Sequence, residues 1–156
     1  IHTVYNGIDT DTYPFYPTPT QPAYLAFVGR LSPEKGPKEA IAIALASGLP
    51  LKMAGKIDAV DRDYFRQELE PLIDGDQIQY LGEVSHQEKV QLLGGATVTL
   101  FPITWREPFG LVMIESMAAG TPVIGMAMGS VPEVIAHGKT GFVCQTYEEM
   151  AQMVPA

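Results

Sequence analysis

Short apolar runs alternate with amphipathic stretches along most of this chain of 156 residues. The run at 23–29 is short and has no helical period, which is typical of a strand buried on both faces. The stretch at 33–47 is typical of a helix, and Gly48 and Pro50 end it. The same alternation continues toward the C-terminus. It predicts strands at 23–29, 51–55, 77–81, 97–101, 122–125 and 141–144, and helices at 33–47, 62–73, 85–93, 109–119, 131–136 and 148–154.

Strands that alternate with helices through short connections indicate βαβ units with right-handed crossovers. We therefore expect an α/β fold of three layers, in which helices cover both faces of a mostly parallel sheet of about six strands. Ligands of such sheets bind beyond the carboxyl ends of the strands, near the point where the strand order reverses. The loops that follow strands, at 29–35, 55–58, 81–84, 102–110 and 126–130, are therefore the places to search for a site.

The first residues differ from this pattern. A short strand at 3–5 is predicted to end in a turn at Asn6 and Gly7. Residues 11–22 contain four prolines, which favours an extended linker or surface loop. We therefore divide the chain into a junction strand and proline-rich linker at 1–22 and a domain at 23–156. The chain starts without a methionine and stops without a closing signal, so we expect further residues on both sides.

Composition and charge narrow the classes of function. A net charge of −8 argues against a general binder of nucleic acid or of anionic membranes. The single cysteine, Cys144, excludes an internal disulfide and fits a reducing compartment. No apolar run is long enough for a transmembrane helix. We expect a cytoplasmic protein, peripheral to a membrane at most through a missing domain. The histidines are far apart in sequence, and no metal-ligand cluster is visible.

The predicted helix at 109–119 is apolar nearly all round, and Glu115 is its only charge. Such a helix is buried, and a lone buried carboxylate is costly unless a donor satisfies it. No basic residue lies one turn away on the same helix. The partner of Glu115 is therefore either a distant lysine or arginine or a pair of ligand hydroxyls, and the pattern leaves both open.

The loop after the strand at 23–29 carries two cations beside a helix start, Arg30 and Lys35. Ser32 suits the N-cap position and Pro33 the first helical position. Bare cations are unfavourable at the positive end of a helix, whereas an anion held between them would be stabilised. The alternative is a pair of solvated surface cations, partly compensated by Glu34.

A second candidate anion site opens the helix at 109–119. Gly110 would let a ligand approach the backbone, where the N–H groups of the first turn are free. Glu107 lies just before the helix, where it could complement the helix dipole or bind hydroxyl groups attached to the anion. With Glu115 two turns further, these residues outline hydroxyls, a diphosphate and more hydroxyls. That is the outline of a nucleotide-sugar.

The motifs at 27–36, 107–115, 120–124 and 129–135 resemble the C-terminal domain of group 1 glycosyltransferases. These are retaining enzymes of the family 4 type with the GT-B fold, and residues 6–9 resemble the family's domain junction. The resemblance covers most of the chain in the family's order and spacing. It implies a Rossmann-like domain that binds a nucleotide-sugar donor and that needs neither a metal nor another cofactor.

The resemblance also implies roles for single residues. Arg30 and Lys35 match the pair that holds the donor diphosphate, Glu107 the carboxylate near the sugar hydroxyls, and Glu115 the acid that binds the ribose hydroxyls. The backbone at 109–111 would contact sugar and phosphates, and 81–84 the nucleobase. Lys56 departs from the family's common pattern beside Gly55. The expected catalytic residues are Glu107, Arg30 and Lys35, and the expected donor-binding residues are Gly29, Arg30, Lys35, Gly55, Leu81, Glu107, Phe109, Gly110, Leu111 and Glu115.

We therefore expect hexosyl transfer with retention from a donor, for which the family favours UDP-glucose, to an unknown acceptor bound mostly by a missing N-terminal domain. Two alternatives remain open at this point. They are a sugar-nucleotide epimerase of related fold and a nucleotide-binding α/β domain without catalytic activity. Trp105 either lines the sugar pocket or belongs to a core or interdomain contact.

Overall fold

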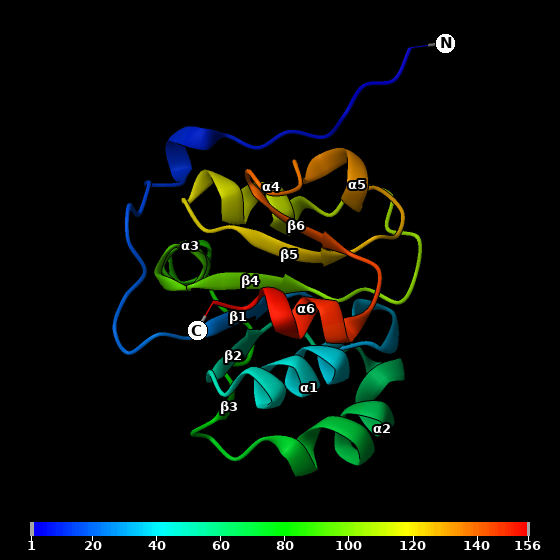
Figure 1. The fold of residues 1–156 in the computed structure, drawn as a ribbon. Helices are drawn as coiled ribbons and strands as arrows, with labels where there is room; N and C mark the ends of the chain where they lie inside the picture. The colour runs from blue at the N-terminus through cyan, green and yellow to red at the C-terminus, as the bar shows by residue number, and fades with distance from the viewer. Residues whose placement is uncertain (1, 156) are drawn as a thin grey trace.

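The computed structural model describes residues 2–155. Within them, six strands form one fully parallel sheet in the order β3-β2-β1-β4-β5-β6 (Figure 1). The strands are β1 Leu25–Val28, β2 Leu51–Ala54, β3 Ile78–Tyr80, β4 Val98–Phe101, β5 Val123–Met126 and β6 Gly141–Cys144. The α-helices are α1 Pro37–Ser47, α2 Arg62–Tyr64, α3 His86–Gly95, α4 Leu111–Ala118, α5 Val131–Val134 and α6 Tyr147–Met153.

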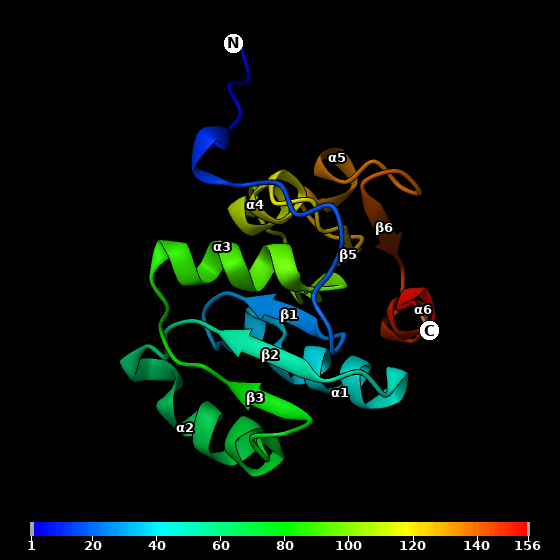
Figure 2. The same cartoon turned by 90° about the vertical axis from the view of Figure 1, so that its left-hand side faces the viewer.

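Helices cover both faces of this sheet, as the alternation in the sequence predicted (Figures 1 and 2). On one face α1 packs against α6, and the segment at 62–72 lies beside α1. On the other face α3 packs against α4. The strand order reverses between β1 and β4, which pair directly through Leu25 and Val98. Within residues 2–155, none of the helices combines the length and the apolar character needed to cross a bilayer.

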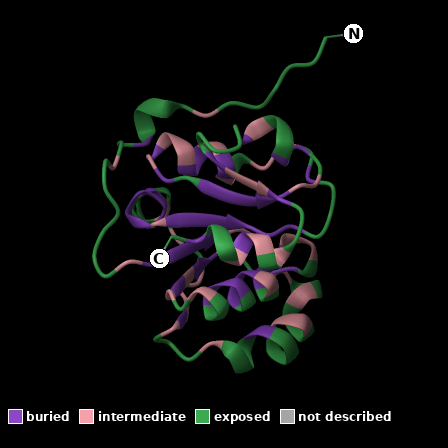
Figure 3. Ribbon diagram, in the orientation of Figure 1, coloured by how far each residue is buried: buried purple, intermediate pink, exposed green. Residues whose placement is uncertain are grey.

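The core lies along the sheet, where β4 and β5 are buried throughout (Figure 3). Leu25, Leu51 and Ile124 are fully shielded from solvent. Continuous burial of this kind explains why the strand segments are apolar runs without alternation: both faces of a parallel sheet are covered by helices. The sequence-based prediction of an α/β fold with about six strands is confirmed.

The start of α3 is fixed by the capping box that the sequence predicted. The Ser85 side chain accepts a hydrogen bond from the backbone N–H of Glu88, and the Glu88 carboxylate accepts one from the backbone N–H of Ser85. Two N–H groups that the helix cannot satisfy itself are thereby paired.

We expect Ser85→Ala to lower the free energy of unfolding by about 1 kcal/mol, because the cap bond is lost. Gln87→Ala, an exposed change in the same helical turn, is the matched control. Urea denaturation of both variants measures the difference. Equal stability of the two variants would show that the cap contributes nothing.

The helix predicted at 33–47 is interrupted. A 3-10 turn, Pro33–Lys35, is followed by Gly36 in the left-handed conformation at φ 74°, and α1 starts at Pro37. Ser32 occupies the N-cap position of this turn and Pro33 its first position, as predicted, but the Ser32 side chain makes no capping hydrogen bond. Glycine adopts positive φ without the steric cost that other residues meet, and this allows the break.

Two other predicted elements also differ. Residues 3–5 form no strand and are exposed to solvent. The helix predicted at 62–73 is α-helical only over α2 and continues as a π-turn, Phe65–Leu69, and a 3-10 turn, Glu70–Leu72. Pro71 has no N–H to donate, which prevents a regular α-helix there.

Helix α4 starts later and is less buried than predicted. Gly110 is left-handed at φ 77°, so the helix begins at Leu111. Met113, Glu115 and Ser116 are buried, whereas Leu111 is 42% exposed. The prediction of burial therefore holds for one face of the helix only.

Residues 9–20 form an extended segment that we call the N-terminal strap. It lies across α3 and α4 (Figure 2). The Tyr16 N–H donates to the Ala119 carbonyl at 2.9 Å, and the Thr20 N–H donates to the Gly95 carbonyl at 3.0 Å. A Cβ atom on Gly94 would lie 2.1 Å from the Tyr16 ring, so this glycine lets the ring lie against α3. Apart from a short 3-10 turn, Thr10–Thr12, the strap is extended. Backbone hydrogen bonds hold it against the ends of α3 and α4.

Candidate functional site

A cleft of about 400 Å³ opens at the carboxyl ends of β1 and β4, where the strand order reverses. Open α/β sheets bind ligands at this position. The loops that follow the two strands form its walls, and the start of α4 closes one end. The lining consists of Asn6, Val28, Gly29, Arg30, Lys35, Phe101, Glu107, Pro108, Phe109, Gly110, Leu111 and Val112.

The two loops are held together by close backbone contacts. A Cβ atom on Gly36 would lie 1.9 Å from the Pro102 carbonyl oxygen, so only glycine permits this approach. Nearby, the Thr104 N–H donates to the Glu34 carbonyl at 3.0 Å. These contacts bring Lys35, from the loop after β1, to the loop after β4.

Glu107 is fixed by two donors inside the cleft. Lys35 Nζ lies 2.5 Å from Glu107 Oε2, and Trp105 Nε1 donates to the same oxygen at 3.0 Å. The side chains of Lys35 and Glu107 are 19% and 10% exposed. Trp105 is itself 36% exposed, and its ring also faces Lys35 at 5.2 Å. Trp105 thus orients the carboxylate, a role that the sequence did not indicate.

Arg30 is more exposed and has two carboxylate partners. Its guanidinium lies 3.1 Å from Glu34 and 3.5 Å from Asp58. Hydrogen bonding to Lys56 lowers the pKa of Asp58, so this carboxylate stays ionised beside Arg30. Neither Arg30 nor Lys35 is therefore a bare cation. Arg30 matches the alternative of a solvated surface cation compensated by Glu34, whereas Lys35 belongs to an ion pair shielded from solvent.

The turn before α4 is supported from the loop after β5. The Ser130 side chain donates to the Phe109 carbonyl at 2.7 Å, and the Ser130 N–H donates to the Glu107 carbonyl at 2.9 Å. A Cβ atom on Gly129 would lie 2.3 Å from the Glu107 carbonyl oxygen. Gly129 and Ser130 therefore shape the site. Both residues belong to the family motif at 129–135, but nothing in the sequence indicates this role.

Glu115 forms an ion pair with Lys89, which reaches it from α3. The Lys89 Nζ lies 2.7 Å from Glu115 Oε2, and Glu115 is only 8% exposed. Of the two partners left open by the sequence, the structure shows the distant cation. No local periodicity could have identified Lys89, because it lies on another helix.

The predicted site residues thus separate into two groups. Gly29, Arg30, Lys35, Glu107 and the turn at 109–111 line one cleft. The remaining three, Gly55, Leu81 and Glu115, lie outside its lining. Gly55 packs on the backbone of Gly29, since a Cβ atom on it would lie 1.7 Å from the Gly29 oxygen, and Leu81 is 46% exposed after β3.

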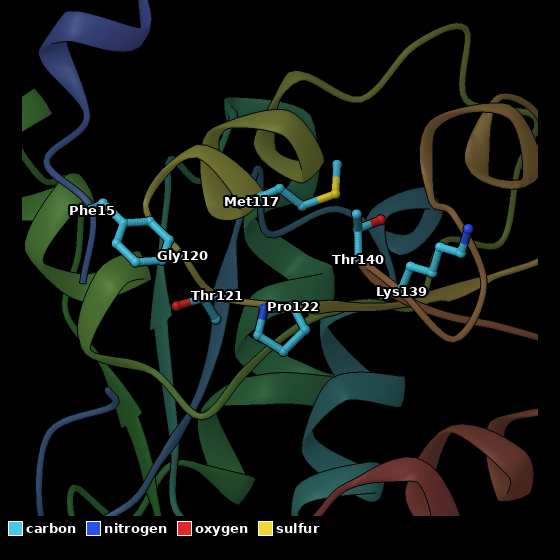
Figure 4. A pocket seen from close by; sticks show the side chains of 7 residues that line it. All are labelled: Phe15, Met117, Gly120, Thr121, Pro122, Lys139 and Thr140. Atoms are coloured by element: carbon cyan, nitrogen blue, oxygen red, sulfur yellow. The ribbon is translucent and has the colours of Figure 1, made fainter. Parts of the chain in front are cut away.

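A second hollow, of about 320 Å³, lies at the opposite end of the strands, near their amino ends (Figure 4). It adjoins the residues that precede β5 and β6 and contains none of the predicted site residues. Its lining consists of Phe15, Met117, Gly120, Thr121, Pro122, Lys139 and Thr140. Among residues 2–155, no group of three or more His, Cys, Asp or Glu side chains is arranged to hold a metal ion.

The sequence model of the family "Glycosyl transferases group 1" matches residues 11–154. The chain belongs to this family. It is 34% identical over 151 residues to the glycogen synthase of Mycobacterium tuberculosis, a match that covers 92% of this chain. The resemblance seen in the sequence is thereby confirmed.

Solved structures agree on the fold of this group 1 glycosyltransferase chain. HepE of Anabaena, in complex with UDP and glucose, matches 97% of the chain with a TM-score of 0.79 at 26% identity. The C-terminal domain of LpcC, a group 1 glycosyltransferase of Francisella tularensis, matches 94% of the chain and 85% of that domain with a TM-score of 0.74 at 21% identity. The chain spans 36% of the length of the glycogen synthase and 45% of that of HepE.

Proposed function

We propose that this domain binds a nucleotide-diphosphate-sugar, of the UDP-glucose type, as the donor half of a retaining hexosyltransferase of the family 4 type. The observation that carries the proposal is the shielded pair of Lys35 and Glu107 at the β1/β4 switch point, beside the start of α4. This pair places a cation that would bind phosphate next to a carboxylate that would accept hydrogen bonds from sugar hydroxyls. The acceptor site would belong to a further part of the polypeptide, because the chain spans less than half the length of the glycogen synthase and of HepE.

The chemistry follows from the charges around the cleft. Transfer breaks the bond between the anomeric carbon and the diphosphate oxygen and forms a bond from that carbon to the acceptor, which loses a proton. The nucleoside diphosphate departs, and negative charge grows on its oxygen. Lys35, Arg30 and the N–H groups of the first turn of α4 would stabilise it, which is the usual source of catalysis in such sites. Glu107 would orient the sugar and stabilise the positive charge that develops on its ring. Proton NMR of the product of the complete polypeptide tests retention.

The choice of UDP-glucose is supported by relatives. HepE of Anabaena has been solved in complex with UDP-glucose, and it matches 97% of this chain at 26% identity. Calorimetric titration of the chain with UDP, GDP, ADP and UDP-glucose tests the proposal. We expect selective binding of UDP and UDP-glucose in the micromolar to millimolar range, because a few charge-assisted hydrogen bonds must offset the cost of association. If none of these nucleotides binds to the chain or to its complete polypeptide, the proposal is wrong.

Replacing Glu115 by alanine should lower the affinities for UDP and UDP-glucose by the same factor, roughly tenfold or more. Both ligands carry the ribose that this carboxylate would bind. Glu148→Ala, on an exposed position of α6, is the control. A loss confined to UDP-glucose would contradict the assignment of Glu115 to the ribose.

A further inference from the structure

The pair of Lys89 and Glu115 is enclosed by three segments of the chain. Glu115 comes from α4 and Lys89 from α3, with side chains that are 10% and 25% exposed. Tyr13, on the N-terminal strap, is 8% exposed and lies close enough to interact with both charged groups. Burial and the negative charge of Glu115 raise the pKa of the Tyr13 hydroxyl, whereas the positive charge of Lys89 lowers it.

Lys89 is held in place by its own helix and by the strap. His86 precedes it by three residues and therefore shares its side of α3. The His86 ring meets the Tyr13 ring edge to face at 5.1 Å, and His86 Nε2 lies 3.3 Å from the Thr12 carbonyl oxygen. With the capping box at the start of α3, these contacts fix the first turn of the helix, from which Lys89 reaches Glu115.

A ribose diol alone would leave the negative charge of the buried Glu115 carboxylate unbalanced. Hydroxyl groups donate hydrogen bonds, but they carry no charge that would balance a carboxylate withdrawn from water. The pair with Lys89 supplies this balance. It runs through one oxygen, Oε2, and a carboxylate has further acceptor sites on both oxygens. The ion pair and the diol are therefore complementary partners of Glu115 and not alternatives.

The position of the pair connects it to the donor cleft. Leu111 and Val112 line the cleft, and Glu115 follows on the same side of α4 one turn later. A nucleotide whose diphosphate lies at Gly110 would extend its ribose along this side of the helix. Lys89 itself follows the loop at 81–84, which is proposed to contact the nucleobase.

We propose that Lys89 is a positioning residue for the nucleoside: its ammonium group balances the charge of Glu115 and orients the carboxylate for the ribose diol, beside Tyr13 of the strap. This inference depends on the proposed function, because it deepens the role of the same site. It predicts that the effect of Lys89 on binding passes through the ribose hydroxyls.

The test compares UDP with 2′,3′-dideoxy-UDP, which lacks both ribose hydroxyls. Each is titrated into the wild-type chain and into Lys89→Met, Lys89→Gln, Lys89→Arg and the control Lys139→Met, an exposed lysine near the amino end of β6. We expect Lys89→Met and Lys89→Gln to weaken UDP roughly tenfold and to leave the dideoxy compound unchanged. Lys89→Arg should restore most of the affinity, and Lys139→Met should change nothing.

Several results would overturn the inference. Equal losses for UDP and the dideoxy compound would assign Lys89 a structural role only, and unchanged UDP affinity in Lys89→Met would deny it any role. Thermal melting verifies that each variant is folded, and the contrast of Lys89→Gln with Lys89→Arg decides the question if Lys89→Met does not fold. If the wild-type chain binds UDP and the dideoxy compound equally well, Glu115 does not bind the ribose hydroxyls and the inference is wrong, whereas the proposed function stands. Absence of all nucleotide binding would remove both.

Discussion

Replacing Glu107 by glutamine should separate the affinities for UDP and UDP-glucose. The sugar would lose its charged acceptor, and a charge-assisted hydrogen bond contributes enough to lower UDP-glucose affinity roughly ten- to hundredfold. The same change removes the carboxylate that pairs with Lys35, with 2.5 Å between Lys35 Nζ and Glu107 Oε2. Lys35 becomes free for the diphosphate, so UDP should bind as well as before or more tightly. Calorimetry with both ligands measures the two effects on one protein.

The control for this prediction is Glu148→Gln, which makes the same change at an exposed position of α6. It should leave both affinities unchanged. A parallel loss of UDP and UDP-glucose in Glu107→Gln would mean that Glu107 organises the whole cleft and does not contact the sugar. Glutamine is preferred to alanine because its amide oxygen can still accept the hydrogen bond from the Trp105 indole.

Replacing Gly36 by alanine should be the most destabilising single change at the cleft. The residue has φ 74°, a conformation that costs other residues about 1–2 kcal/mol. Its Cβ atom would also lie 1.9 Å from the Pro102 carbonyl oxygen, and the overpacking adds about 1–3 kcal/mol. We expect a total loss of about 2–5 kcal/mol, together with loss of donor binding, because the loops after β1 and β4 would separate.

Gly48→Ala provides the matched control. Gly48 is also left-handed, at φ 77°, but a Cβ atom there would meet nothing within 4 Å. This variant carries the conformational cost without the collision. Urea denaturation should show a clearly smaller loss for Gly48→Ala than for Gly36→Ala, and donor affinity should be preserved. Equal losses would show that the contact between Gly36 and Pro102 does not constrain the cleft.

The fold was predictable because its strands are buried on both faces and so appear as apolar runs. The sixth strand, Gly141–Cys144, matches its predicted limits, and the predicted helices are all present in some form. The errors have local causes. The break at Gly36 serves a contact with Pro102, far away in sequence, and the strand predicted at 3–5 makes no sheet contact. Neither fact is contained in the hydrophobic pattern.

The sequence indicated which residues form the site better than it indicated which of them pair with one another. The loops after β1 and β4 meet as parallel topology requires, and this brings Lys35 to Glu107. The sequence indicated an anion between Arg30 and Lys35, but in the structure each has a carboxylate partner from another loop. Lys89 was overlooked for the same reason. Pairing between separate elements depends on how they pack, and no periodicity within one element records it.

The place of β1 in the sheet also governs the order in which the domain is completed during synthesis. One neighbour, β2, follows β1 directly, whereas the other, β4, emerges only after β3 and α3 have been made. Until then one edge of β1 has no partner, and unpaired strand edges invite association with other chains. Pairing over such a long separation is also slow. The nascent chain should therefore be most prone to aggregation before Phe101 has been added, and the donor cleft cannot exist earlier.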